Sequence, residues 1–184
     1  MLYKENSQNQ DYERYFSQSL SNDQSELIGS ILYSREEVNN ILSAKFSPET
    51  KNGLIYSVNR ISMNSQDFDY FAKYFDLIDP HQIQNSTSEV AMHLEYYFRD
   101  FDPTTLTKED KEKLKDILVL LNQWVDVIDV EYDGITYQNQ NEVISNVLND
   151  NRKDFFGSDV WRNIIVGLDR VSKDNITFAK SIEN

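Results

Sequence analysis

The chain has 184 residues, the length of one domain, and its 39% hydrophobic and 12% aromatic residues are enough to form a buried core. It contains no Cys and only two His, which excludes disulfide scaffolds, thiolate metal sites and cysteine catalysis. Its 31 acidic and 18 basic residues leave a net charge of −13, which disfavours direct binding to nucleic acid or to anionic membranes.

Apolar residues recur at helical spacing through most of the chain. We therefore predict a mainly α fold, a compact single helical domain over residues 1–184 with about seven or eight helices. Residues 1–25 are expected as a peripheral N-terminal helix or arm, and a second helix follows over 25–46. Ser65 is expected to cap a further helix that ends at Asp79-Pro80, because a residue before proline is pushed out of the helical conformation.

The next helix is expected to start at Thr87 or Ser88 and to stop at Asp102-Pro103. Thr107 and Asp110 then have the spacing of a capping box, and the apolar repeat behind them is the clearest in the chain. The last long helix is expected to begin after Gly157-Ser158.

In one segment the spacing of apolar residues changes from the helical period to the two-residue period of a strand. Residues 130–137 alternate in polarity around Asp133-Gly134, a pair favoured in two-residue type I′ turns. Such a turn pairs Tyr132 with Ile135 and Val130 with Tyr137, with all four on one face. We predict a small β-hairpin near 130–137 that packs this face on the helices.

The negative charge is concentrated in two segments. Residues 65–103 and 126–150 each have a net charge of −6, and the second contains no basic residue. These segments are either solvated helix faces or the two parts of one acidic face that docks a basic partner. The candidate contacts of such a face are Asp67, Asp69, Asp76, Asp79, Glu95, Asp100, Asp102, Asp126, Asp129, Glu131 and Asp133. Tyr70, Tyr74 and Tyr96 are the exposed aromatic candidates, since tyrosine is enriched at binding hot spots.

The sequence contains only weak matches to known metal-binding or catalytic motifs. Asp129, Glu131 and Asp133, followed by Gly134, resemble the start of an EF-hand calcium loop, but Gln140 stands where the bidentate Glu should be. These three are weak metal candidates only. No phosphate loop, nucleophile elbow or zinc motif is present, and we assign no catalytic residue and no cofactor.

These observations favour a non-enzymatic acidic protein that inhibits a basic partner, such as a nuclease or another nucleic-acid-binding protein. An immunity protein, an antitoxin or a phage antidefence protein that imitates nucleic acid has this chemistry. The alternatives are an adaptor or subunit of a larger assembly, and a carboxylate-based metal-dependent module or hydrolase. No secretory signal or membrane span is evident, so we expect a cytoplasmic protein. The oligomeric state stays open.

Overall fold

The computed structural model describes residues 2–47, 49–151 and 154–182, with side chains for residues 12–47, 49–149 and 154–182. This part of the chain forms helices and loops without a strand. The six helices are α1 (Leu2–Leu42), α2 (Thr50–Tyr74), α3 (Ser86–Asp100), α4 (Lys108–Asp129), α5 (Gln140–Asn151) and α6 (Asp159–Ser181).

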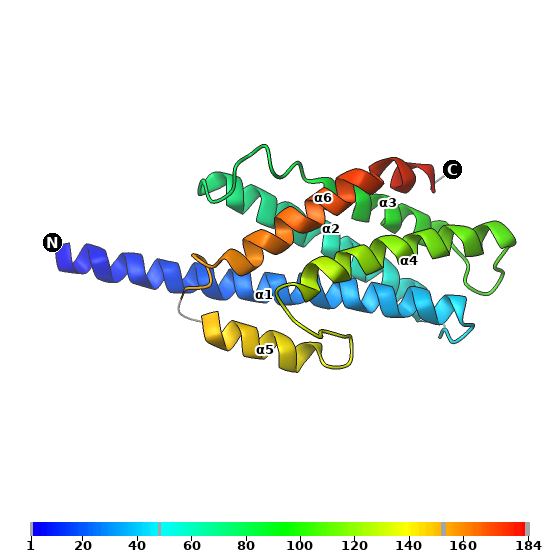
Figure 1. The fold of residues 1–184 in the computed structure, drawn as a ribbon, viewed down its shortest axis with the longest axis horizontal. Helices are drawn as coiled ribbons and strands as arrows, with labels where there is room; N and C mark the ends of the chain where they lie inside the picture. Colours follow the sequence, from blue (N-terminus) through cyan, green and yellow to red (C-terminus); the bar gives the residue numbers. More distant parts are fainter. Residues whose placement is uncertain (1, 48, 152–153, 183–184) are drawn as a thin grey trace.

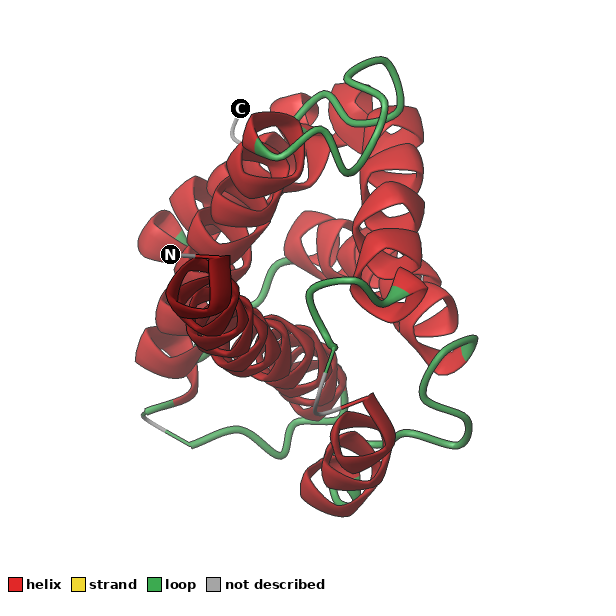
Figure 2. Ribbon diagram, turned by 90° about the vertical axis from the view of Figure 1, so that its left-hand side faces the viewer, coloured by secondary structure: helices red, strands yellow, loops and turns green. Residues whose placement is uncertain are grey.

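Five helices enclose the core. α1 packs against α2 and α4, α6 packs against α3 and α4, and α2 packs against α3, so the order around the core is α1, α2, α3, α6, α4. α5 lies outside this ring beside α1, and the first turns of α1 extend past the other helices (Figures 1 and 2). None of the helices in the described residues is long and apolar enough to cross a membrane.

Trp124 of α4 and Trp161 of α6 are the largest fully buried side chains. Each indole N–H has a partner: Trp124 Nε1 donates to the Ser172 hydroxyl at 3.0 Å, and Trp161 Nε1 donates to the Phe156 carbonyl at 3.2 Å. The apolar positions of the regular helical repeats surround these rings. The mainly α class predicted from periodicity is therefore confirmed.

The expected count of seven or eight helices is wrong, because two expected boundaries lie inside continuous helices. The helix predicted over 1–25 runs on into the next, since no proline or glycine interrupts residues 2–28 and the buried stripe continues from Leu20 to Leu27. Ser65 caps nothing. It is buried in the middle of α2, whose apolar stripe continues to Phe68 and Ala72.

α2 also ends five residues before the expected stop at Asp79-Pro80. Asp76 adopts a left-handed conformation (φ 57°), the amide of Leu77 bonds the Ala72 carbonyl at 2.9 Å, and the amide of Asp76 bonds the Lys73 carbonyl at 3.3 Å. This pattern is a Schellman termination, with Asp in the place usually taken by glycine. By contrast, the capping box of Thr107 and Asp110 and the N-cap at Ser158 are confirmed.

The β-hairpin predicted near 130–137 is wrong, because this segment forms turns. A type I′ turn needs positive φ at both central residues, but only Gly134 has it (φ 70°). The Tyr132 amide, which a hairpin would bond to the Ile135 carbonyl, instead bonds the Ile128 carbonyl of α4 at 3.0 Å. Side chains hold the turn: the Asp129 carboxylate accepts from the Gly134 amide at 2.9 Å, and the Asn139 amide donates to the Gly134 carbonyl at 2.9 Å. Tyr132 is buried while Val130 is 79% exposed, so the expected shared apolar face does not form.

Candidate functional site

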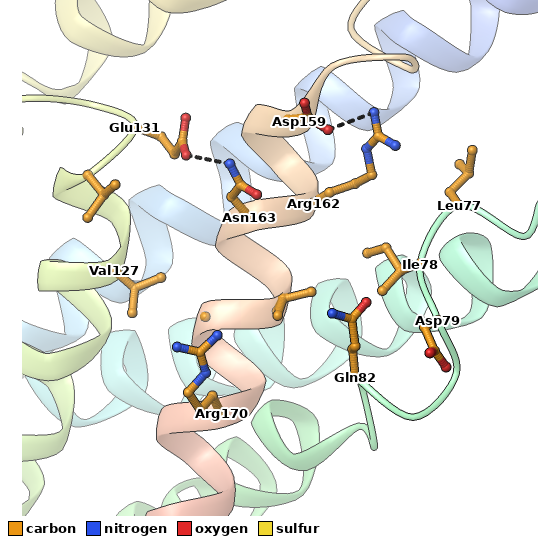
Figure 3. A pocket seen from close by; sticks show the side chains of 13 residues that line it. Leu77, Ile78, Asp79, Gln82, Val127, Glu131, Asp159, Arg162, Asn163 and Arg170 are labelled. Carbon is orange, nitrogen blue, oxygen red and sulfur yellow. Dashed lines mark hydrogen bonds and ion pairs between the residues drawn. The ribbon is translucent and has the colours of Figure 1, made fainter.

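A groove of about 580 Å³ lies over the outer face of α6 (Figure 3). The α2–α3 loop forms one wall and the end of α4 with the two residues after it forms the other, while α6 forms the floor. The charged and amide side chains in the groove are Asp79 and Gln82 on the first wall, Glu131 on the second, and Asp159, Arg162, Asn163 and Arg170 on the floor.

Two contacts hold these walls against α6. Asp169, which is 3% exposed, accepts hydrogen bonds from the backbone amides of Gln84 at 3.0 Å and Ser86 at 2.6 Å, and so ties the α2–α3 loop to α6. On the other side Gly167 allows close packing: a Cβ there would lie 2.5 Å from a methyl carbon of Val127 on α4. Both walls of the groove are therefore packed directly against α6.

The floor contains two arginines, of which one is bonded within the fold and the other is not. Arg162 pairs with Asp159 at 3.1 Å and also donates to the Ser158 and Gly157 carbonyls. Arg170 is exposed and makes no hydrogen bond or ion pair with any side chain that the structure describes. Because Arg162 is used by the start of α6, Arg170 is the cation of the groove that is available to a bound partner.

The groove brings the two acidic segments together. Asp79 belongs to residues 65–103 and Glu131 to residues 126–150, and Figure 3 shows them on opposite sides of α6. Glu131 is held by the Asn163 amide at 2.8 Å, and Asp79 accepts the His81 backbone amide at 2.9 Å. Each carboxylate keeps lone pairs for a further donor.

The other candidate carboxylates have different surroundings. Asp126, Asp129 and Asp133 are exposed beside the α4 wall, and Asp76 is exposed in the loop after α2. Four candidates lie away from the groove: Asp67 is exposed on α2, Asp69 is buried on α2, Glu95 is buried on α3, and Asp100 is exposed at the end of α3. Asp102 is exposed in the loop after α3, where bonds from the hydroxyl and the amide of Thr104 lower the pKa of its carboxyl.

The aromatic candidates Tyr70, Tyr74 and Tyr96 are exposed at 69%, 71% and 43%, but they lie outside the groove. Tyr70 and Tyr74 stack on the outer face of α2 with centroids 6.1 Å apart. Tyr96 lines a second hollow of about 470 Å³ between the ends of α3 and α6 and the start of α4, together with Asp100 and Lys113.

The three weak metal candidates do not converge. The Asp129 carboxylate accepts a hydrogen bond from the Gly134 amide, and the Glu131 carboxylate accepts one from the Asn163 side chain. The Asp133 side chain is exposed. Among the described residues no group of three or more His, Asp or Glu side chains is placed to hold a metal ion.

Sequence reasoning missed the floor of the groove. Residues 159, 162, 163, 166 and 170 follow helical spacing along one face of α6, which is a signal in the sequence. Charge does not point to this face, because residues 151–184 have a net charge near zero. Comparison with known proteins adds no identification: no family model, curated protein or solved structure matches this chain.

Proposed function

We propose that this chain is a non-enzymatic binding protein that engages and neutralises a basic, nucleic-acid-handling protein. The observation that carries the proposal is that Asp79 and Glu131, one from each acidic segment, line opposite walls of the same groove over α6. Basic side chains of the partner would reach these carboxylates, while Arg170 would pair with an acidic or carbonyl group beside them.

The charge around the groove supports this assignment. Asp126, Asp129 and Asp133 are exposed at the end of α4 and in the turns after it, and a net charge of −13 steers a basic protein toward the chain. Apolar side chains inside the groove give a partner something to bury besides charge: Leu77, Ile78, Val127, Val130 and Val166. We therefore expect the apolar side chains to contribute affinity for the partner, and the negative charge to make association with a basic partner fast and sensitive to salt.

The test is capture of partners from the native host's lysate by the tagged full chain, with washes at low and at high salt. We expect one basic, nucleic-acid-handling protein that is retained at low salt and lost at high salt. A stoichiometric partner that survives the high-salt wash, or no basic partner at either salt, would overturn the proposal.

A matched pair of variants locates the site. The variant Asp126→Lys/Asp133→Lys reverses two exposed carboxylates near the groove, and Asp100→Lys/Asp116→Lys reverses two exposed carboxylates on α3 and on the first half of α4. Both variants shift the net charge by the same amount. If only the first variant loses the partner, the result supports binding at the groove. Equal loss in both variants would show that the partner responds only to the total charge of the chain.

A further inference from the structure

A small cavity lies inside the molecule between α2, the α2–α3 loop with the start of α3, and α6. Its volume is about 10 Å³, which is the space of one water molecule or one bare ion. It is lined by Ser65, Asp69, Ile83, Asn85, Thr87, Ile165 and Asp169. Six of these residues are buried and Asn85 is partly exposed. Side chains with oxygen atoms from three separate elements therefore surround a space for a single small occupant.

Two buried oxygens on residues of this lining have no hydrogen-bond partner among the described residues: the hydroxyl of Ser65, which is 5% exposed, and the amide oxygen of Asn85. Asn85 is the N-cap of α3, where an asparagine side chain usually bonds a backbone amide of the first turn, but it makes no such bond. An unpaired buried oxygen costs free energy. Two of them on one small cavity indicate that an occupant of the cavity supplies the missing contacts.

The lining also carries more negative than positive charge. Asp69 and Asp169 are 9% and 3% exposed, and Lys73 is paired with Asp69 at 2.8 Å. Asp169 accepts the backbone amides of Gln84 and Ser86 but has no ion pair with any residue that the structure describes. One buried negative charge is therefore left without a counter-charge. A water molecule would contact the unpaired oxygens but brings no charge, whereas a cation supplies both.

The available ligand atoms define the class of cation. Carboxylate, hydroxyl and amide oxygens are hard ligands, which suit Ca²⁺ and Mg²⁺ rather than the metals that His and Cys bind. One oxygen from each of the three neutral side chains and one or two from each carboxylate give five to seven contacts, and Ca²⁺ takes six to eight. Mg²⁺ keeps several of its water molecules, for which a cavity of about 10 Å³ has no room.

We propose that this cavity binds one calcium ion through Ser65 and Asp69 of α2, Asn85 and Thr87 at the start of α3, and Asp169 of α6. The ion joins three elements, and it ties the α2–α3 loop to α2 as well as to α6. The proposal does not depend on a protein partner, and its tests use the purified chain alone. It can therefore fail without the proposed function failing, and the reverse also holds.

Calorimetric titration of the purified, chelator-treated full chain with CaCl₂ tests the site. We expect one equivalent to bind with a dissociation constant of about 10 µM to 1 mM, because the site has only two carboxylates. At a calcium concentration about 100 times this constant, the melting temperature should rise by about 5 °C or more. MgCl₂ at the same concentration measures non-specific screening of a chain of net charge −13. Equal shifts with both salts, or no stoichiometric binding, would show that the cavity holds water only and would overturn the proposal.

Ser65→Ala locates the ion by removing one ligand oxygen. The hydroxyl has no bond to lose in the described structure and alanine favours a helix, so without calcium the variant should melt at about the temperature of the parent. Its calcium dissociation constant should rise about tenfold or more. Ser57→Ala is the matched control, because Ser57 is similarly buried on α2 (6%) but lies outside the cavity. Unchanged affinity in Ser65→Ala would place the ion on surface carboxylates and overturn the proposal.

Asn85→Asp changes the affinity in the opposite direction. The substitution keeps the size of the side chain and replaces a neutral ligand oxygen by a third carboxylate, and calcium affinity rises with the number of charged ligands. The dissociation constant should therefore fall about tenfold, as the same titration measures. Asn175→Asp, on α6 and away from the cavity, adds the same charge to the chain and should leave the affinity unchanged. An equal gain in both variants would show that calcium responds only to the total charge, and would contradict the site.

Discussion

The two acidic segments carry the same net charge of −6 but contribute differently to the molecule. In residues 65–103 several carboxylates belong to the fold: Asp69 is buried with Lys73 at 2.8 Å, and Glu95 is buried between Asn59 at 3.0 Å and Arg99. In residues 126–150 the carboxylates from 126 to 133 lie at the surface, and Asp126 and Asp133 make no bond among the described side chains.

Net charge along a sequence therefore does not define a binding surface. A buried carboxylate needs donors on its oxygens, and the donors hold it in the fold where a partner cannot reach it. An exposed carboxylate without a bond adds little to stability and is available for recognition. The four predictions that follow test whether the segments differ in this way.

The largest expected effect is at Glu95. Glu95→Ala removes the acceptor for Asn59 and Arg99 and leaves a partly buried amide without its partner, so the free energy of unfolding should fall by about 2 to 3 kcal/mol. Urea unfolding followed by circular dichroism measures the loss. Asp133→Ala is the control on the other segment. A loss of under about 0.5 kcal/mol at Glu95 would show that its bonds add nothing beyond exposed pairs.

The second prediction concerns what residues 126–150 do contribute to the fold. Burial raises the pKa of the Tyr132 phenol, and the Glu131 carboxylate raises it further. The folded state therefore keeps this proton above pH 10 while the unfolded chain loses it, so stability is full below pH 10 and falls as pH rises. The loss is about 1.4 kcal/mol per pH unit for one such tyrosine.

Tyr132→Phe should reduce this alkaline loss and cost little at pH 7, because the buried hydroxyl has no hydrogen-bond partner in the described structure. Melting temperatures of the variant and the parent from pH 8 to pH 11.5 measure the effect. Tyr97, whose pKa burial also raises, remains and keeps part of the slope. Identical slopes for both proteins would contradict the assignment.

Sequence patterns predicted the parts of the fold that follow local rules. The repeat behind Thr107 predicted α4, and its capping box has both expected bonds. Tyr70, Tyr74 and Tyr96 are exposed as expected. These features depend only on the 3.6-residue period and on residues within one turn of each other.

The errors arose where more distant contacts compete with local signals. Ser65 has the composition of a cap, but tertiary packing buries it in α2, and Asp133-Gly134 favours a hairpin, but Asp129 and Asn139 bond the same backbone. In the candidate site, Asp79 and Glu131 were both predicted, yet their position on opposite walls of one groove depends on which helices pack together. No local pattern encodes that packing.

The third prediction concerns the neutral stretch between the acidic segments. The Thr107 hydroxyl and amide lower the pKa of Asp110, so this carboxylate stabilises the fold above about pH 4, the range of an unperturbed carboxyl, and the contribution disappears as pH falls further. Thr107→Ala should cost about 1 kcal/mol at pH 7. Urea unfolding at pH 7 and at pH 3 should show a smaller difference between the two proteins at pH 3; an equal difference at both would assign the effect to packing.

The smallest effect is expected at the surface carboxylates of residues 126–150. Asp126→Asn and Asp133→Asn should each change the free energy of unfolding by no more than about 0.5 kcal/mol, since neither side chain has a bond to lose among the described residues. At low salt the change should be a gain, because each substitution relieves repulsion within a chain of net charge −13, and the gain should vanish at high salt. Salt-dependent unfolding measures this sign. A loss comparable to that of Glu95→Ala would erase the contrast between the segments, because it would mean that these carboxylates are also part of the fold.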